Sequence, residues 1–558
     1  MNIDHDNYDA IVIGSGISGG WAAMELCKKG LKTLLLERGR NVEHIKDYPT
    51  ANLNPWDFKN GFRNTVKEVA DDPIHSKIYD PSNKHFFISD KEHPYIQEKP
   101  FNWFRGYQVG GKSLTWGRQC YRWSDLDFQA NVKDGHGIDW PIRYKDIAPW
   151  YDYVESFIGV SGQAEHLPQL PDGNFLPAME LNCVERHLAE SLKTKQKRVL
   201  TIARVANLTR GWDNRGPCQN RNLCSRGCPF GGYFSSNSST IPAAMATGKL
   251  TLRPFSIVSE LIYDEKNKKA SGVKVIDAQT HHQLQFNARI IFVNASTIAT
   301  TALLLNSKSK RFPNGFGNDS GQLGHNLMDH HSSAGAMGVY NGLKDRYYKG
   351  RRPSGFLIPR YRNLESSDQQ SFLRGYNIQG DGERLGWKDR QAEAGFGIDF
   401  KSKLTSPGKW SVWMAGWGEC LPYFDNKISL DPEKKDQWGL PLVKIDFEFK
   451  ENEKKMMNDI METSEYMLKD AGFEEVSSFN YNSPGGSTVH EMGTARMGHD
   501  PKHSVLNKYN QVHAAKNVFI TDGSCMTSSA CQNPSLTYMA LTARACDFAV
   551  QELKEGNL

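Results

Sequence analysis

The chain has 558 residues, of which 39% are hydrophobic and 23% are charged, and its formal net charge is +5. This length predicts two or three domains with a large hydrophobic core. The small net charge excludes a broad basic surface for nucleic acid, and the basic run KTKQKR at 193–198 is expected to be a solvated face.

The first residues and the most apolar segment bear on the cellular location of the protein. The opening residues, MNIDHDNYDA, are polar and acidic and lack the basic start and apolar core of a secretory signal. The most apolar segment, IIFVNASTIATTALLL at 290–305, is shorter than the roughly 18–20 residues of a membrane span and contains Asn and Thr. We therefore expect no direct membrane span, and a chain that is cytoplasmic or is exported by a partner.

The first fifty residues carry the clearest pattern. Apolar residues at 8–13 predict a buried strand, 17–29 a helix and 33–37 a second strand. Between the first strand and the helix, Gly14, Gly16 and Gly19 form G-x-G-x-x-G, which permits a tight turn, approach of a pyrophosphate and close helix packing. Glu37, about twenty residues on, would accept hydrogen bonds from a ribose. The pattern predicts a dinucleotide site without distinguishing NAD from FAD.

The rest of the chain alternates between predicted strands and helices. Residues 253–295 read as successive strands with polar turns, and 427–431 and 442–449 as further strands. A helix is expected over 451–472 with Gly472 as its stop, a strand at 517–524, and a long helix from about Ser535. This order predicts an α/β protein with an inserted domain.

Several separated segments resemble the glucose–methanol–choline (GMC) oxidoreductase family over nearly the whole chain. They are the N-terminal fingerprint, GYQVGGKSLTWG (106–117), VNASTIATTALLLNS (293–307) with GQLGHNLMDHH (321–331), HEMGTARMG (490–498) and NVFITDGSCMTSSACQNPSLTYMALTARA (517–545). The resemblance implies FAD as cofactor and an α/β fold: a Rossmann-type FAD-binding domain with an inserted mixed-sheet-plus-helices substrate domain. The implied bounds are 1–130, 200–335 and 480–558 for the FAD domain, and 131–199 and 336–479 for the substrate domain and cover segments.

The resemblance also implies the catalytic pair. His490 matches the family's base, and Asn533 in CQNPSLT matches the residue that holds the same hydroxyl. A neutral imidazole suits a base that works near neutral pH. Without the resemblance, His490 would be read as a turn histidine and Asn533 as a helix start.

Further residues are expected to contact the flavin. Asp522 matches the position that approaches the ribityl–pyrophosphate, and the backbone of Val258 the position that meets the adenine. Thr115 stands where some sugar-oxidising relatives carry a His that bonds covalently to the flavin, which implies non-covalent FAD here. The full set of expected cofactor contacts is Gly14, Gly16, Ser18, Gly19, Glu37, Arg38, Gly110, Gly111, Ser113, Thr115, Val258, Asp522 and Pro534.

Three cysteines cluster in GPCQNRNLCSRGCPFGG (216–232). Cys218, Cys224 and Cys228 have the spacing C-x5-C-x3-C-P, and three thiolates suffice for a [3Fe–4S] cluster. The spacing resembles that of multi-subunit sugar dehydrogenases of the family, which pass electrons through the cluster to a cytochrome. Zinc would need a fourth ligand, while a disulfide and bare thiols stay open. The other seven cysteines, at 27, 120, 183, 420, 525, 531 and 546, are expected to be buried thiols.

Together these features predict FAD-dependent oxidation of a secondary alcohol of a sugar or glycoside, with C3 of a pyranoside favoured. Hydride would pass to flavin N5, and electrons would go through the cluster to a cytochrome-type acceptor. A small partner subunit carrying the export signal would place the enzyme in the periplasm, with the cytoplasm as the alternative. The other hypotheses are an O2-using pyranose or long-chain alcohol oxidase without a cluster, and a hydroxynitrile-type flavin lyase.

The substrate is the least determined feature. Four aromatic residues lie in KWSVWMAGWGECLPYF, and aromatic rings stack on the apolar faces of sugars. Alternation of Trp and Met along a strand also indicates ordinary core packing, and the sequence favours this second interpretation. The four residues are Trp410, Trp413, Trp417 and Tyr423.

Overall fold

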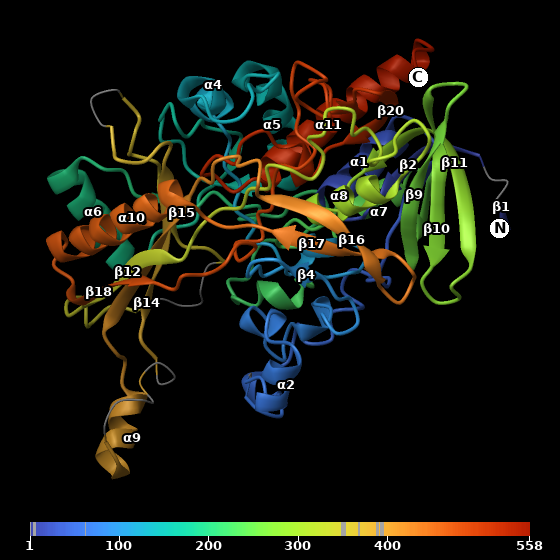
Figure 1. Ribbon diagram of the computed structural model, residues 1–558. Helices are drawn as coiled ribbons and strands as arrows, with labels where there is room; N and C mark the ends of the chain where they lie inside the picture. The colour runs from blue at the N-terminus through green and yellow to red at the C-terminus, as the bar shows by residue number, and fades with distance from the viewer. Residues whose placement is uncertain are drawn as a thin grey trace.

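A computed structural model describes the chain except for residues 1, 4–6, 62, 348–352, 366–368, 387–389 and 391–394. Its largest sheet has nine strands and is seen at the right of Figure 1. The central order is β19 (Gln511–Val512), β20 (Ala515–Ile520), β11 (Gln283–Val293), β2 (Tyr8–Ile13), β3 (Thr33–Leu36) and β8 (Leu250–Arg253). All these neighbours pair in parallel except β19 and β20.

Three further strands extend the sheet from β11. These are β1 (Asn2–Ile3), β9 (Ser256–Asp264) and β10 (Lys269–Asp277), of which β9 and β10 form an antiparallel extension. The expected strands at 8–13, 33–37, 253–295 and 517–524 are thus all present, although β3 ends at Leu36.

The register of the parallel strands brings their carboxyl ends to one edge. Ile13 pairs with Leu36 and with Val293, and Val293 pairs with Ile520. The residues that follow these strands therefore meet at one edge, where open α/β sheets bind their ligands.

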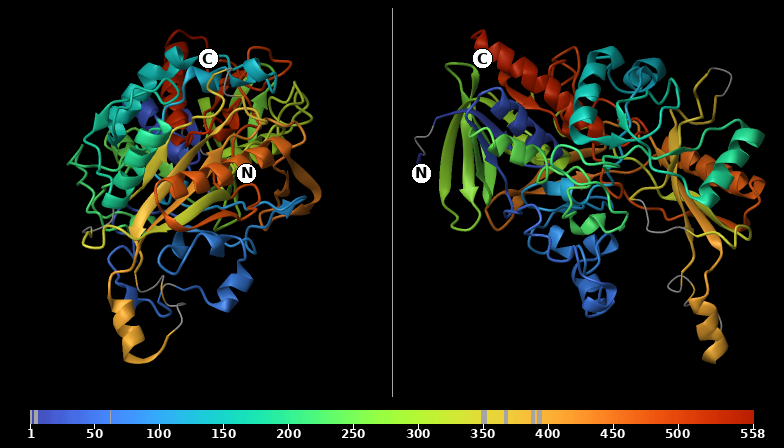
Figure 2. Two further views of the ribbon diagram at one scale, coloured as in Figure 1. Left: turned by 90° about the vertical axis from the view of Figure 1, so that its left-hand side faces the viewer. Right: turned by 180° about the vertical axis from the view of Figure 1, so that it is seen from behind.

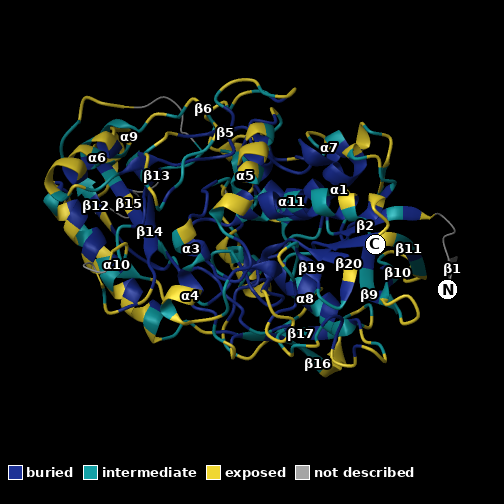
Figure 3. Cartoon of the chain, turned by 90° about the horizontal axis from the view of Figure 1, so that it is seen from above, coloured by how far each residue is buried: buried dark blue, intermediate teal, exposed yellow. Residues whose placement is uncertain are grey.

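Helices cover the sheet. α1 (Ile17–Lys28) packs against α11 (Ser535–Lys554) and α7 (Thr240–Met245), and α11 packs against α5 (Tyr144–Ile158). α8 (Thr297–Asn306) packs against β9. Figure 3 shows β2 as predominantly buried and α5 with exposed residues, whereas α1 is buried from Ser18 to Cys27. None of the described helices is both long and apolar enough to cross a membrane.

A second sheet has six antiparallel strands, seen from the other side in Figure 2. Its order is β18 (Glu474–Asn480), β12 (Ala334–Tyr340), β15 (Trp410–Gly418), β14 (Tyr376–Arg384), β13 (Phe356–Ile358) and β7 (Thr201–Ile202). α10 (Glu451–Asp470) and α6 (Cys183–Gln196) pack against this sheet.

The sequence of α10 explains its position. Met456, Ile460 and Met467 recur at helical spacing, are buried, and belong to the core formed with the six-stranded sheet. The Lys450 amide donates to the Glu453 carboxylate at the N-terminus of the helix, and Gly472 follows its end with a φ of 78°. The helix expected over 451–472 is therefore confirmed.

The remaining elements are short. Strands β16 (Lys427–Lys435), β17 (Pro441–Asp446) and β4 (Ile96–Gln97) form one small sheet, and β5 (Val160–Ser161) and β6 (Phe175–Leu176) another. The short helices are α2 (Val66–Asp71), α3 (Asp125–Phe128), α4 (Ala130–Asp134) and α9 (Gly397–Thr405), of which α9 projects from the body in Figure 1. The 3-10 turns used below are η4 (Gly111–Leu114), η5 (Cys224–Arg226) and η7 (Gly523–Cys525).

The architecture is the α/β fold expected for the GMC family, with a Rossmann-type sheet and a sheet-and-helix part beside it. The bounds predicted for the two domains stay a prediction.

Candidate active site

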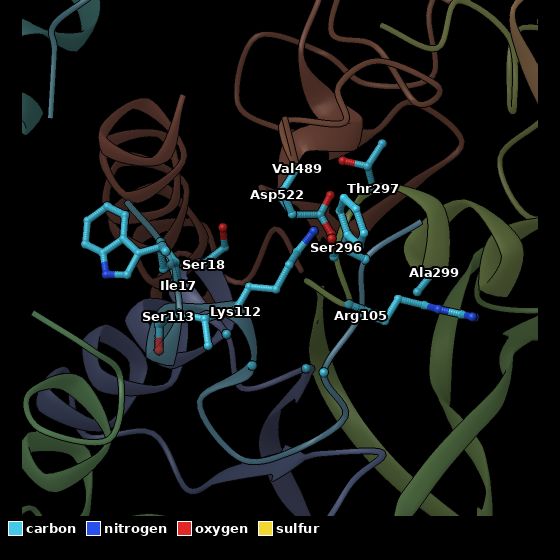
Figure 4. Close-up of a pocket in the computed structure, with 18 of the residues that line it drawn as sticks. Ile17, Ser18, Arg105, Lys112, Ser113, Ser296, Thr297, Ala299, Val489 and Asp522 are labelled. Carbon is cyan, nitrogen blue, oxygen red and sulfur yellow. The ribbon is translucent and has the colours of Figure 1, made fainter. Parts of the chain in front are cut away.

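A cavity of about 510 Å³ opens at the carboxyl ends of the parallel strands. This volume lies within the range of small-molecule sites. Figure 4 shows three segments that contribute side chains to it: the start of α1 with Ile17 and Ser18, the η4 loop with Lys112 and Ser113, and the start of α8 with Thr297. The loop before η7 contributes Asp522.

The glycines of the G-x-G-x-x-G turn shape one end of the cavity. Gly14 has a φ of 91°, which disfavours other residues, and a Cβ on Gly19 would collide with the carbonyl oxygen of Gly14. A Cβ on Gly16 would meet no atom within 4 Å among the described residues, so the backbone of Gly16 faces open space in the cavity. The turn therefore leaves room beside the N-terminus of α1, as a pyrophosphate requires.

Glu37 lies at the same edge of the sheet, directly after β3. One carboxylate oxygen accepts the Ser15 amide at 3.1 Å and the Ser15 hydroxyl at 2.5 Å, and the other accepts the Gly39 amide at 3.0 Å. Burial raises the pKa of this carboxyl, while the bonds from Ser15 and Gly39 oppose that rise. Glu37 lines the cavity, so its carboxylate lies where a ribose hydroxyl of a bound dinucleotide would be.

The η4 loop forms a second wall of the cavity. Gly110 precedes η4 with a φ of 92°, and its amide donates to the Ser15 hydroxyl at 2.9 Å. The Ser113 hydroxyl donates to the Gly110 carbonyl at 2.5 Å and accepts the Ser236 amide at 3.0 Å. These bonds fix the loop against the glycine turn, so that Thr115, at the end of η4, lines the cavity.

Asp522 faces the cavity from the end of β20. One of its oxygens accepts the amide and hydroxyl of Ser524, at 3.0 and 2.5 Å, and the other accepts the Thr300 hydroxyl at 2.5 Å. Burial raises the pKa of Asp522, and these hydrogen bonds act in the opposite direction.

The donor and acceptor set fits a dinucleotide such as FAD. The N-termini of α1 and α11 both reach the cavity, through Ser18 and Ser535, and helix N-termini favour anionic groups. Buried polar atoms that line the cavity lack a partner within the described part of the chain, including Asn294 Nδ2 and Tyr538 Oη. Buried polar groups are normally hydrogen-bonded, so these atoms are suited to a polar ligand.

The two residues expected to be catalytic meet in this cavity. His490 Nε2 lies 3.4 Å from Asn533 Nδ2, although the residues are 43 positions apart. Burial lowers the pKa of His490 well below its usual value, and the nearby His330 and Lys112 lower it further. The imidazole is therefore neutral at neutral pH, which is the form a base requires.

The loop that carries His490 is held in an unusual conformation. Val489 is a β-branched residue with a φ of 63°, a region that such residues rarely adopt. Asp329 supports the loop: its carboxylate accepts the amides of Gly486 and His490, at 2.7 and 3.2 Å, and the Thr488 hydroxyl at 2.5 Å. Burial, followed by the charge of nearby Glu491, raises the pKa of Asp329 to about 7.

The structure brings most of the expected residues to one cavity. Of the residues expected from the sequence, those that line the cavity are Gly14, Gly16, Ser18, Glu37, Arg38, Gly111, Ser113, Thr115, Val258, His490, Asp522 and Asn533. Gly19, Gly110 and Pro534 do not line it. Gly19 and Gly110 support the loops that do, and Pro534 directly precedes α11. These roles stay predictions.

The prediction of an iron–sulfur site is wrong, because the three thiols are not arranged as a cluster site. Cys218, Cys224 and Cys228 are free and partly buried. Among the described residues, their three Sγ atoms do not form a group that lies within 4.8 Å of one another, the spacing that a shared metal or cluster requires. Burial raises the pKa of Cys218, and the nearby thiols of Cys224 and Cys228 raise it further.

Another trio lies closer together but is occupied by a hydrogen-bond network. Among the described residues, Asp72, His75 and Asp90 are the one group of His, Cys, Asp or Glu whose ligand atoms all lie within 4.8 Å of one another. His75 Nδ1 contacts Asp72 at 3.1 Å, His75 Nε2 accepts the Arg105 amide at 3.2 Å, and the Arg105 guanidinium pairs with Asp90. Both ring nitrogens of His75 therefore have protein partners.

Most of the remaining cysteines are buried, whereas the four aromatic residues range from the buried Trp410 to the exposed Trp413. Of the other seven cysteines, six are buried and Cys183 is partly exposed. Trp410 is buried in β15, and Trp413 stacks on Phe479 with ring centroids 6.0 Å apart. The Tyr423 hydroxyl donates to Glu453 at 3.1 Å. None of these four aromatic residues, for which the sequence favoured core packing over sugar stacking, lines the cavity.

Sequence reasoning missed several residues around His490. His330 Nδ1 lies 2.9 Å from His490 Nδ1, and the Gln379 amide donates to Asn533 Oδ1 at 2.8 Å. Lys112 forms an ion pair with Glu491. His330 lies in the segment GQLGHNLMDHH, which the family resemblance included, but no role followed from its sequence alone.

Comparisons with known proteins place the chain in a family. Residues 8–332 match the N-terminal family model described as GMC oxidoreductase, and residues 422–542 match the C-terminal one. The chain is similar to 2-methyl-1,2-propanediol dehydrogenase of Mycolicibacterium austroafricanum, with 27% identity covering 98% of this chain and 96% of that protein. It is also similar to the fructose dehydrogenase large subunit of Gluconobacter japonicus, with 26% identity covering 98% of each chain.

A solved structure shows the same fold. The formate oxidase of Aspergillus oryzae superposes with a TM-score of 0.63 at 15% identity, and 99% of each chain is covered.

Proposed function

Because this chain belongs to the GMC oxidoreductase family, we propose that it is an FAD-dependent dehydrogenase that oxidises a secondary alcohol of a sugar or glycoside. C3 of a pyranoside is the favoured position, and an external acceptor such as a cytochrome takes the electrons. The observation that carries the proposal is the pairing of His490 and Asn533, 3.4 Å apart, inside the cavity built by the glycine turn.

The proposed chemistry divides between one base and one hydrogen-bonding group. The alcohol loses the proton of its hydroxyl to His490 Nε2 and a hydride from its carbon, so the O–H and C–H bonds break and a carbonyl forms. Asn533 Nδ2 holds the same hydroxyl oxygen and does not compete for its proton. Bound FAD supplies the two-electron acceptor for the hydride.

The residues that would hold FAD follow from the cavity. The turn at Gly14 and Gly16 and the N-terminus of α1 would take the pyrophosphate, and Glu37 the adenosine ribose. Val258 would lie against the adenine, and Thr115 and Asp522 along the flavin part. Thr115 has no ring nitrogen for a covalent link, so the proposal includes non-covalent FAD.

The substrate class is supported by the relatives in a general way. One is named a dehydrogenase of 2-methyl-1,2-propanediol and another of fructose, and both of these compounds carry more than one hydroxyl group. The name "large subunit" supports a smaller partner for this chain too, and export with that partner to the periplasm belongs to the same proposal. The mass of the enzyme purified from its native cells tests this point, and a mass equal to one chain alone would argue against the partner.

Flavin bleaching tests the catalytic assignment. The flavin-loaded enzyme is mixed anaerobically with methyl glucopyranoside, D-glucose, D-fructose, D-gluconate and 2-methyl-1,2-propanediol in turn. We expect bleaching with at least one sugar or glycoside, and a loss on the order of 10²–10⁴-fold in its rate for His490→Ala. His325→Ala, which removes a histidine stacked on Phe424 outside the cavity, is the matched control and should keep the rate. An undiminished rate in His490→Ala would remove the base from the proposal.

The products identify the position and the acceptor. Product analysis by NMR locates the new carbonyl, and a carbonyl at C3 is expected for a pyranoside. Turnover with a dye or cytochrome acceptor should exceed turnover under air, where peroxide is measured. Peroxide formed at the rate of substrate consumption would indicate an oxidase instead, and an alcohol that is cleaved without bleaching would indicate a lyase.

A further inference from the structure

His330, which contacts His490, has its own protonation state fixed by its surroundings. His330 Nε2 lies 2.8 Å from the carbonyl oxygen of Ala530 and 3.2 Å from that of Ser529. Carbonyl oxygens only accept hydrogen bonds, so Nε2 carries a hydrogen. Burial lowers the pKa of His330 to about 4, so the ring is neutral at pH 7 and its Nδ1 is a bare acceptor.

This state of His330 determines the tautomer of His490. The two Nδ1 atoms are 2.9 Å apart and the rings are nearly perpendicular, at 84°. A hydrogen bond at this distance needs one hydrogen, and only His490 can supply it. Since a neutral imidazole has a single N–H, the hydrogen on His490 Nδ1 leaves Nε2 as an open lone pair.

The opposite side of His490 is arranged to match. Asn533 Oδ1 accepts from Gln379 Nε2 at 2.8 Å, which turns the Asn533 amide nitrogen toward His490 Nε2. Gln379 also donates to Asn377 Oδ1 at 3.1 Å, and Asn377 donates to the carbonyl of Cys531. The donor and the acceptor of every hydrogen bond in this network are therefore fixed, and the donor Asn533 Nδ2 faces the open lone pair of His490 Nε2.

We propose that His330 is a positioning residue for the oxidation of the alcohol: it accepts the Nδ1 hydrogen of His490 and so keeps Nε2 free to take the substrate proton. This inference rests on the proposed function. In the step, the hydroxyl O–H bond breaks, an N–H bond forms at Nε2, the hydride leaves the carbon, and His490 becomes a cation while His330 stays neutral.

The neighbouring residue completes the arrangement. Asp329 holds the backbone amide of His490, whereas His330 holds its ring. Without an acceptor at Nδ1 the hydrogen is shared between both ring nitrogens, and the form with Nε2–H cannot take a proton. It would also place two donors against each other at Asn533.

Three variants of the full-length, flavin-loaded enzyme test this role. His330→Leu removes the acceptor, His330→Asn restores an acceptor oxygen near the former Nδ1, and His331→Leu removes the adjacent buried histidine, which contacts Met456 rather than His490. The rate of flavin bleaching and the apparent Kd are measured with the fastest substrate of the panel above. Flavin content and Tm are recorded for each variant.

We expect His330→Leu to lower the bleaching rate on the order of 10²-fold, with the apparent Kd changed less than about threefold, because the lost effect is on proton transfer. His330→Asn should recover most of that loss, and His331→Leu should keep the wild-type rate whatever its Tm. In ¹⁵N-histidine-labelled enzyme, the resonances lost in His490→Ala should show a protonated Nδ1 in the wild type and a tautomer mixture in His330→Leu.

The outcomes separate this inference from the proposed function. A wild-type rate in His330→Leu together with slow His490→Ala would overturn the role of His330 alone. Fast bleaching in His490→Ala would overturn the base itself. His330→Leu cannot be assayed if it fails to retain flavin, and two other results then decide. Slow flavin bleaching in a His330→Asn variant that retains flavin would overturn the inference. A protonated Nε2 on His490 of the wild-type enzyme would also overturn it.

Discussion

Lys112 and Glu491 form an ion pair with Nζ and Oε2 3.0 Å apart, which joins the loop expected to hold the flavin to the residue next to His490. Both residues line the cavity, and the side chain of Glu491 is 3% exposed whereas that of Lys112 is 31% exposed. The positive charge of Lys112 is one of the causes that lower the pKa of His490, after burial and His330. The pair therefore links the cofactor loop to the protonation of the base.

The pH dependence of flavin bleaching should depend on Lys112. The unprotonated His490 is the active form, so the rate rises as pH increases through its pKa and is level above it. Because that pKa lies below the usual value, the rise should be complete before about pH 6.5. Lys112→Met removes a charge that disfavours protonation, so the pKa of His490 rises and the acid limb moves to higher pH. Lys91→Met, which removes an exposed partner of Asp71, should leave the limb in place, and an unmoved limb in Lys112→Met would contradict the coupling.

The glycine turn should not tolerate a methyl group at Gly19. The added Cβ would collide with the carbonyl oxygen of Gly14, and overpacking of this kind costs about 1–3 kcal/mol. We expect Gly19→Ala to lower both Tm and the flavin content per chain. Gly211→Ala serves as the control, since its Cβ would have Arg215 O as its nearest contact at 3.8 Å. Equal flavin content in both variants would argue against the turn as the pyrophosphate site.

The flavin should be released on denaturation. Thr115 lines the cavity at the position where a covalent histidine would stand, and threonine lacks the ring nitrogen for that bond. Acid precipitation is expected to leave the yellow colour in the supernatant. Colour that stays in the pellet would show a covalent link through another residue.

The orientation of Asn533 should depend on Gln379. Gln379→Met keeps the side-chain length but removes the donor to Asn533 Oδ1, so the amide of Asn533 becomes free to turn. We expect bleaching to slow about tenfold, the effect of one net hydrogen bond of about 1 kcal/mol or slightly more. The same substitution at Gln285, which donates to Asn287 in β11, should have no effect on the rate. If flavin bleaching is as fast in Gln379→Met as in the Gln285 variant, Gln379 does not orient Asn533.

The parts of the fold that are local in sequence were predictable, and the contacts between distant segments were not. The strand at 8–13 and the helix after it follow from apolar spacing and from glycines within one short unit, and α1 ends at Lys28, one residue before the expected end. His490 and Asn533 were placed only through the family resemblance, because 43 residues separate them.

His330 shows why the rest could not be derived. It lies 160 positions from His490, and its role depends on the carbonyl of Ala530, 200 positions away. No periodicity relates such residues, since their approach follows from the packing of several segments. The cysteines show the opposite failure: a regular local spacing predicted a cluster, yet the Sγ atoms of Cys218, Cys224 and Cys228 are not gathered within 4.8 Å of one another in the described structure.

The hydrogen bonds that start from the ring of His490 lead through His330 on one side and through Asn533 on the other. They end on the carbonyls of Ala530 and Cys531, which are adjacent in the chain. A carbonyl oxygen has no hydrogen to pass on, so this hydrogen-bond network cannot carry a proton away from His490. The proton that His490 gains in each turnover can therefore leave only from Nε2, the same atom that meets the substrate hydroxyl in the proposed function. A product that stays bound there keeps the proton on His490, and so holds the enzyme in the protonated form that cannot act as a base.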